Sequence, residues 1–341
     1  MAQGRRLKPG KDGLKIAIIW PVGLRDRCEL MNFVSLRSNL AHPCQETERG
    51  EAQELSRSSF MEFRRASIQP GRVLIRPVSG WVPLSFRELW EYRELLYFLV
   101  WRDLKVRYKQ TVLGVAWVVL QPLFLMLVFT LFFGRLVGVP SDGLPYSIFA
   151  YSGILPWQLF SRGLNEASMS LVANERVITK IYFPRLLVPV SAVLSSLIDF
   201  SVAFIVLVGF VLFYGIQPGL SILALPLFVL LVVTASLGVS VWLAALNVVY
   251  RDVRYTLPLL TQIWMFATPI IYPVSVVPEA WRSLYSLNPM VGVVEGFRWS
   301  LLGKASPADL MFVVSALIVV AVFIGGIFYF QRVEQTLADV I

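Results

Sequence analysis

The sequence contains little charge, little histidine and little cysteine. Only 16% of its 341 residues are charged and 56% are hydrophobic, whereas soluble globular chains average about 25% charged and roughly 45–50% apolar residues. The one histidine, His42, leaves no imidazole in the apolar part of the chain, which argues against histidine-based catalysis and proton relays. Cys28 and Cys44 have no accompanying cluster of metal-binding residue types. We therefore expect no metal site and no cofactor on this chain.

Sequence motifs of common enzymes are also missing. No G-x-x-x-x-G-K-[ST] loop is present for binding nucleotide phosphates, since the nearest string, WSLLGKAS (299–306), lacks the first glycine and the final Ser or Thr. The chain also has no G-x-S-x-G or H-E-x-x-H string and no paired acidic motif for glycosyl transfer. We expect a chain that is not an enzyme.

Long apolar runs dominate the chain instead, as in LVPVSAVLSSLIDFSVAFIVLVGFVLFY (187–214). About 20 consecutive apolar residues suffice for a helix to cross the hydrocarbon core of a bilayer. The sequence therefore predicts an all-α integral membrane protein. Six transmembrane helices are predicted, over residues 112–136, 145–170, 187–214, 222–246, 255–273 and 310–330.

The basic residues indicate how these spans are oriented. Lys and Arg are concentrated before the first span and in the connections after the second and fourth spans, whereas the opposite connections contain few of them. Such an excess marks the cytoplasmic side, so both termini are predicted to be cytoplasmic. The same placement explains the net charge of +9 without a nucleic-acid partner, because the cations lie beside apolar spans.

The N-terminal region differs from the rest of the chain. Residues 1–60 contain one short apolar run, 16–24, which Pro21 interrupts, and no signal-peptide cleavage site follows it. We interpret residues 1–60 as a disordered extension or as translated sequence upstream of a start at Met61; a structured N-terminal domain is the alternative. The other predicted segments are an extended cytoplasmic segment (61–84), an interfacial helix (85–110), the six-helix permease domain (111–331) and a cytoplasmic tail (332–341).

The interfacial helix is predicted from a start signal and from periodicity. Ser85 and Glu88 form an S-x-x-E capping box. From there to Lys109, charged residues recur at spacings of three and four, with leucines on the opposite side. This pattern favours an amphipathic helix at the cytoplasmic membrane surface. An ordinary solvated helix is the alternative.

Ionisable residues occur in two of the predicted spans. Arg162, Asn165 and Glu166 lie in the inner half of the second span, which Pro156 interrupts. Ionisable groups in spans face a bundle interior or a watery cavity, because exposure to hydrocarbon costs several kcal/mol. Alternatively, the second span ends earlier and leaves these residues in the cytoplasm. Asp199 in the third span is expected to be hydrogen-bonded within the bundle.

The segment 274–309 is too long for a simple loop. It contains two helix-like stretches separated by Asn288-Pro289, and we expect short re-entrant helices that dip into the outer leaflet. Its aromatic residues suit a membrane–water boundary, either as anchors or as an exit lining that stacks on sugar rings. This predicted outer aromatic rim consists of Trp281, Tyr285, Phe297 and Trp299.

Four stretches, 87–123, 153–189, 247–273 and 286–299, resemble the permease of type-2 ABC exporters, in the branch that exports polysaccharides and polyol phosphates. The string NERVITKIYFPR (174–185) and the run TPIIYP (268–273) are the most specific parts. The resemblance implies a homodimer that pairs with two copies of a separate ATPase subunit, which would hold ATP and Mg. It also implies a loop that couples the two, for which we expect a short helix over 174–182. The residues of this coupling set are Asn174, Glu175, Arg176, Ile178, Lys180, Phe183, Pro184, Arg185, Arg251 and Asp252.

The same resemblance implies a lipid-linked glycan as cargo, such as O-antigen, capsular polysaccharide or teichoic acid, crossing the cytoplasmic (inner) membrane. An exporter of drugs or small lipids and a membrane-bound glycan-processing enzyme are the alternatives. A sugar polymer needs a path lined by aromatic and hydrogen-bonding side chains. The candidates for this channel lining are Gln121, Phe124, Phe132, Arg162, Asn165, Glu166, Gln262, Met265, Thr268 and Tyr272.

Overall fold

The computed structural model describes residues 90–109, 111, 114–217, 219–250, 252–303 and 310–340, with the side chains of 283, 310, 311 and 335–340 left aside. All regular secondary structure within these ranges is helical. The expectations for residues 1–60 and 61–84, the capping box of Ser85 and Glu88, and Arg251 lie outside the described residues.

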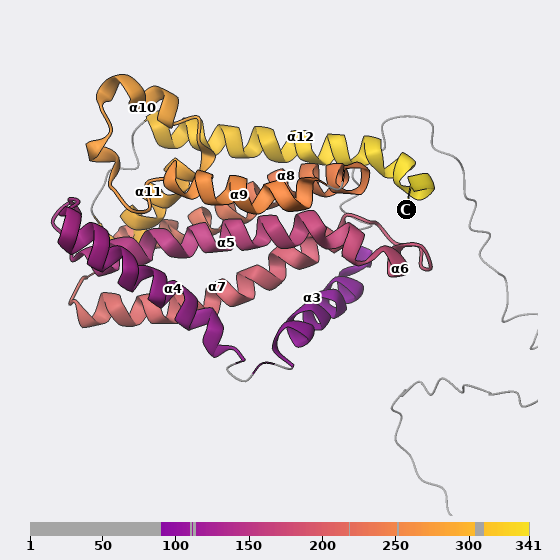
Figure 1. Ribbon diagram of the computed structural model, residues 1–341, viewed down its shortest axis with the longest axis horizontal. Coiled ribbons are helices and arrows are strands. Elements are labelled where there is room, and N and C mark those ends of the chain that lie inside the picture. Colours follow the sequence, from indigo (N-terminus) through magenta and orange to yellow (C-terminus); the bar gives the residue numbers. More distant parts are fainter. Residues whose placement is uncertain are drawn as a thin grey trace, which may run out of the picture. The chain divides into compact units, whose positions relative to one another are not determined.

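Helix α5 (Tyr146–Ala173) lies at the centre of the bundle and packs along α7 (Leu187–Phe213) and α8 (Leu225–Val249). Helix α12 (Leu310–Val340) packs along α8, and these helices run side by side (Figure 1). Most residues of α5 are buried, which explains its moderate hydropathy. A helix that is surrounded by protein does not need the apolar surface that lipid contact requires.

The first predicted span begins with α4 (Ala116–Phe129) and continues as a π-helix, η1 (Thr130–Val137). A 3-10 turn, η2 (Leu220–Ala224), precedes α8. Four stretches of the described residues are long and apolar enough to cross a membrane, namely 116–137, 187–213, 220–249 and 312–334. The number of six spans and the orientation of the termini remain predictions.

The fifth predicted span, 255–273, is shorter as a helix than the sequence suggested. Helix α9 (Val253–Phe266) ends seven residues earlier, and turns follow it. Pro269 and Pro273 account for the difference, because proline lacks the backbone N–H and disfavours the helical conformation of the residue before it. A helix of 14 residues is about 21 Å long, less than the hydrocarbon thickness of about 30 Å.

Helix α3 (Arg93–Tyr108) precedes the first span and is separated from α4 by a turn in which Gly114 has a φ of +49°. Its residue Leu99 is 2% exposed and packs into an apolar cluster with Leu171 and Leu187 at the ends of α5 and α7. The opposite side presents exposed aromatic residues, among them Tyr97 and Trp101. A helix is thus present within the predicted range 85–110, and its position at the membrane surface stays a prediction.

Two short helices follow α9, as predicted for the segment before the last span. They are α10 (Glu279–Tyr285) and α11 (Pro289–Leu302), and a 3-10 turn, η3 (Val274–Val276), precedes them. Asn288 caps α11, since its side-chain oxygen accepts a hydrogen bond from the backbone N–H of Met290 at 3.0 Å. Most residues of α11 are buried, so this helix is part of the core.

Candidate functional site

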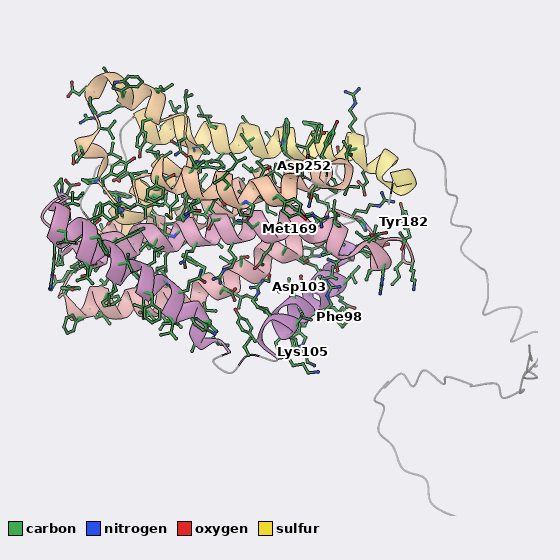
Figure 2. All side chains as sticks on the ribbon, viewed as in Figure 1. Phe98, Asp103, Lys105, Met169, Tyr182 and Asp252 are labelled. Carbon is green, nitrogen blue, oxygen red and sulfur yellow. The ribbon has the colours of Figure 1, made fainter. Side chains whose placement is uncertain are left out.

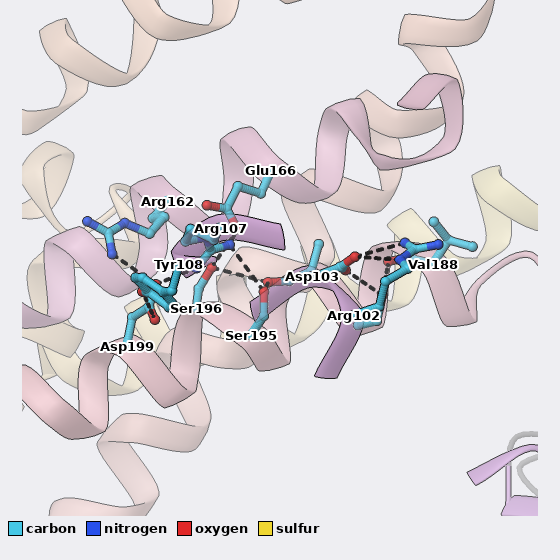
Figure 3. A network of polar contacts seen from close by, with 12 residues as sticks. Arg102, Asp103, Arg107, Tyr108, Arg162, Glu166, Val188, Ser195, Ser196 and Asp199 are labelled. Atoms are coloured by element: carbon cyan, nitrogen blue, oxygen red, sulfur yellow. Dashed lines mark hydrogen bonds and ion pairs between the residues drawn. The ribbon is translucent and has the colours of Figure 1, made fainter. Parts of the chain in front are cut away.

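Charged side chains from three helices meet inside the bundle (Figure 3). Asp199 on α7 accepts hydrogen bonds from Tyr108 at 2.5 Å, from Arg162 at 3.0 Å and from Arg107. Arg107 also pairs with Glu166 on α5. We call these five residues, Arg107, Tyr108, Arg162, Glu166 and Asp199, the Asp199 cluster. It joins the end of α3 to the middle of α5 and α7.

The helices supply these side chains at regular spacings. Arg107 and Tyr108 are the last two residues of α3, while Arg162 and Glu166 lie one turn apart on the same face of α5. The expectation that Asp199 is hydrogen-bonded within the bundle is confirmed. Arg162 and Glu166 do point into a polar interior, but each pairs with another helix and not with its neighbour on α5.

The Asp199 cluster balances its charges in a partly dry environment. The Asp199 side chain is 4% exposed, whereas the other three charged side chains are between 24% and 32% exposed. Two guanidinium groups face two carboxylates, so the cluster is neutral as a set when all four are ionised. Burial and the hydrogen bond to Asp199 raise the pKa of Tyr108 to about 12, which keeps its hydroxyl protonated as a donor.

The polar region extends toward α4. Arg162 Nη2 donates to the side-chain oxygen of Gln121 at 2.8 Å, and Ser196 donates to Glu166 at 3.3 Å. Asn165 donates to the backbone oxygen of Ser161, while its own side-chain oxygen is buried without a partner among the described residues. A small pocket lies beside this region, lined by Val118, Leu155, Gln158, Leu159, Arg162, Ser196, Asp199, Phe200 and Ala203.

Three of the predicted channel-lining residues, Arg162, Asn165 and Glu166, belong to the polar region described above. The others are either exposed or packed against the core. Gln121, Phe124 and Phe132 on α4 and η1, together with Gln262 on α9, are exposed on the surface of the chain. Thr268 was placed wrongly, because it is fully buried and donates to the backbone oxygen of Trp264 at 2.9 Å. The early end of α9 is the reason, since it turns this residue into the core.

Met265 and Tyr272 also lie against the core and not on an open face. The Tyr272 hydroxyl lies 3.0 Å from that of Tyr285, which connects the turns after α9 to α10. Met265 and Tyr272 therefore stabilise the packing of the segment between α9 and α10.

The loop between α5 and α7 contains a shorter helix than predicted. The expected helix over 174–182 is only α6 (Glu175–Ile178), and turns follow it. Pro184 disfavours the helical conformation of Phe183, the residue before it, and so separates this loop from the start of α7. Ile178 and Phe183 are 9% and 5% exposed and pack into the apolar cluster that contains Leu99.

Other side chains of this loop are held from the sides or are exposed. Asn174 donates to the backbone oxygen of Ser170, and Arg185 Nη1 donates to the backbone oxygen of Glu334 on α12 at 2.9 Å. Pro184 is partly buried beside them. The exposed residues of the predicted coupling set are Glu175, Arg176 and Lys180 in this loop and Asp252 before α9.

Arg298 organises the turns that follow α9, and it was not among the predicted site residues. Arg298 on α11 is 2% exposed and donates to the backbone oxygens of Pro269 at 2.5 Å and Ile270 at 2.8 Å. It also pairs with Glu295 at 3.1 Å, and its guanidinium lies 3.8 Å from the centre of the Phe149 ring. Arg298 thereby satisfies two backbone carbonyl groups in the turns that follow α9. The E-x-x-R spacing of Glu295 and Arg298 in an otherwise apolar helix was the sequence signal that could have indicated this buried ion pair.

The predicted outer aromatic rim needs a correction. Phe297 is fully buried and packs edge-on against Phe200 on α7, so it belongs to the core because α11 itself is buried. Trp299 and Tyr285 are partly buried. Trp281 on α10 is 61% exposed and is the one member of the four with most of its surface open.

Comparison with known proteins gives consistent matches. A family model described as ABC-2 type transporter matches residues 94–302. The O-antigen export system permease protein RfbA of Myxococcus xanthus is 32% identical over 252 residues, which cover 73% of this chain and 96% of that protein. A Klebsiella pneumoniae protein of the same name is 31% identical, over 60% of this chain and 79% of that protein. The polysialic acid transport protein KpsM of Escherichia coli is 25% identical, over 70% and 93%.

Proposed function

Because this chain belongs to the ABC-2 type transporter family, we propose that it is the permease subunit of an exporter that carries a lipid-linked polysaccharide across the cytoplasmic (inner) membrane. A separate ATPase subunit binds ATP and Mg and supplies the energy, so this chain itself is not catalytic. Both termini lie in the cytoplasm. The observation that carries the proposal is the similarity to an O-antigen export permease over 96% of that protein's length.

Two copies of the chain form the transport path. The support comes from exposed polar residues on two helices of the bundle. Gln121 on α4 and Gln262 on α9 lie on the surface of the single chain. Polar side chains within a bilayer face protein or a water-filled cavity, because exposure to lipid is costly. A second copy that covers this surface would place both glutamines along a shared path, where they can hydrogen-bond to sugar hydroxyl groups.

The loop between α5 and α7 meets the ATPase subunit. The support is the different burial of residues within the loop. Ile178 and Phe183 are buried in the bundle, while Arg176 and Lys180 are exposed. A loop with such anchors can transmit a displacement of its exposed side to α5 and α7. The Asp199 cluster then lies within the part of the bundle that this displacement reaches, since Glu166 is about two turns from the end of α5.

Reconstitution with the ATPase encoded beside this chain tests the proposal. The purified complex in proteoliposomes should hydrolyse ATP faster when the lipid-linked glycan of the same gene cluster is added, and it should move that glycan across the membrane. An ATPase variant unable to hydrolyse ATP is the control and should abolish both activities. Stimulation by hydrophobic drugs or small lipids, with no response to the glycan, would refute the polysaccharide cargo. A chain that binds no ATPase would refute the exporter itself.

A further inference from the structure

The loop between α5 and α7 presents two side chains, Ile181 and Tyr182, that contact little of the chain itself. Tyr182 is 94% exposed and Ile181 is 59% exposed. Their neighbours on both sides, Ile178 and Phe183, are buried in the apolar cluster at the base of the loop. We call Ile181 and Tyr182 the docking tip. Neither residue belongs to the coupling set predicted from the sequence.

The docking tip is held in place and is not a loose turn. The backbone N–H of Ile181 donates to the oxygen of Val177 at 3.1 Å, which continues the last turn of α6. On the other side of the tip, Arg185 donates to the backbone oxygen of Glu334 at 2.9 Å. Because its base is fixed at several points, the tip can bind a partner with little loss of conformational entropy, and such preorganisation favours affinity.

The position of the docking tip points to a protein partner and not to lipid. Helix α5 has 28 residues and is about 42 Å long, which exceeds the hydrocarbon thickness of about 30 Å. The tip follows the end of this helix. Tyr182 also lies farther along the bundle axis than Phe98 and Lys105 of the interfacial helix α3 (Figure 2). Covering this apolar pair with another protein is favourable, because it removes apolar surface from water.

Charges surround the docking tip but are not part of it. Arg176 and Lys180 are exposed beside it, with Glu175 as the neighbouring anion, so the surroundings are basic by one charge. At protein interfaces a buried aromatic anchor supplies most of the affinity, whereas exposed charges at the rim mainly change the association rate. The surface that fits this arrangement is an apolar pocket with an acidic rim.

We infer that Ile181 and Tyr182 insert into an apolar pocket of the ATPase subunit and supply most of the affinity between permease and ATPase, with Arg176 and Lys180 contributing at the rim. This inference rests on the proposed function, because that function provides the partner. It adds the chemistry of the contact, and it states that the aromatic side chain of Tyr182 contributes more to the binding affinity than the two cations do.

The test measures binding of the purified ATPase, encoded beside this chain, to the full-length permease in nanodiscs. Tyr182→Ala should weaken binding about 30-fold or more, as expected for an aromatic anchor. Tyr182→Phe should stay within about threefold of the unmodified chain, because the ring carries the contact. The double variant Arg176→Ala, Lys180→Ala should lose less than about tenfold and mostly in the association rate.

Tyr97→Ala is the matched control, since Tyr97 is 72% exposed on α3, which is predicted to lie at the membrane surface. It should bind the ATPase as the unmodified chain does. Truncating Tyr182 removes almost no internal contact, so the variant should remain monodisperse in nanodiscs.

Three outcomes overturn the inference. They are a Tyr182→Ala variant that binds within threefold of the unmodified chain, a larger loss for the double charge variant, and a loss of membrane insertion in place of a loss of binding. If the unmodified permease and ATPase bind and respond to glycan while Tyr182→Ala binds normally, the inference fails and the proposed function stands. If the unmodified permease binds no ATPase, the proposed function itself has failed.

Discussion

Removing the carboxylate of Asp199 should detach α3 from the bundle. Asp199 is 4% exposed and accepts hydrogen bonds from Arg107, Tyr108 and Arg162. Asp199→Ala leaves two guanidinium groups opposite the single carboxylate of Glu166, so the cluster changes from neutral to a charge of +1. Breaking a buried ion pair by removing one partner costs about 3–5 kcal/mol.

Solvent reduces this cost at the Asp199 cluster. The side chains of Arg107 and Arg162 are 25% and 24% exposed, so water can hydrate part of each cation once the carboxylate is gone. We therefore expect a loss near the lower end, about 3 kcal/mol for Asp199→Ala. Asp199→Asn keeps the shape and one acceptor oxygen, and it should lose about 2 kcal/mol.

Two measurements follow this loss. Denaturant unfolding of the purified protein in micelles gives the free energy of unfolding. In a chain whose Cys28 and Cys44 are replaced by Ser, a Leu99→Cys reporter gives the detachment of α3. Leu99 is 2% exposed, so a water-soluble maleimide should react with the reporter only when the helix leaves the bundle. Labelling should therefore be slow in the reporter alone and fast when Asp199→Ala is added.

A double-mutant cycle with Arg107→Gln and Asp199→Asn tests the pairing itself. The two changes should be non-additive by about 1–3 kcal/mol, as for residues in one network. Arg102→Gln is the control, because among the described residues Arg102 forms its ion pair with Asp103, its own neighbour on α3, and not with a carboxylate of α5 or α7; its cost should stay below about 1 kcal/mol. Additive effects, or a cost of Asp199→Ala no greater than that of Arg102→Gln, would refute the reasoning.

Three further predictions concern other parts of the chain. A chain that starts at Met61 should insert, bind the ATPase and export normally; impaired assembly in a co-purification assay would contradict this. In the same chain without Cys28 and Cys44, Glu166→Cys should react with a water-soluble maleimide, because the Glu166 side chain is 32% exposed; complete protection would show that no water reaches this position. Gly296→Ala should destabilise the protein by about 1–3 kcal/mol in micelles, since the added Cβ would lie 2.0 Å from the ring of Phe228. Gly209→Ala is its control: nothing lies within 4 Å of the added Cβ, so equal losses would contradict the packing argument.

The sequence was sufficient for the features that depend on local composition. The apolar runs within α7, α8 and α12 predicted helices there, because a helix in a bilayer satisfies its own backbone groups whatever its neighbours are. The capping box and the recurring charges predicted a helix where α3 lies, and Asn288-Pro289 correctly indicated the break between α10 and α11. The resemblance of four stretches was enough to recognise the family.

Tertiary structure decided which side chains meet. Asp199 lies 92 residues from Arg107 and 37 from Arg162 in the chain, and no periodicity within one helix encodes that contact. Arg298 satisfies carbonyl groups 28 and 29 residues away, and this contact exists only because α11 folds back beside the end of α9. Hydrophobic length is a local property of a segment, whereas a buried charge finds its partner only through the packing of separate helices. The sequence alone therefore determined the long apolar helices, and the fold determined the polar network between them.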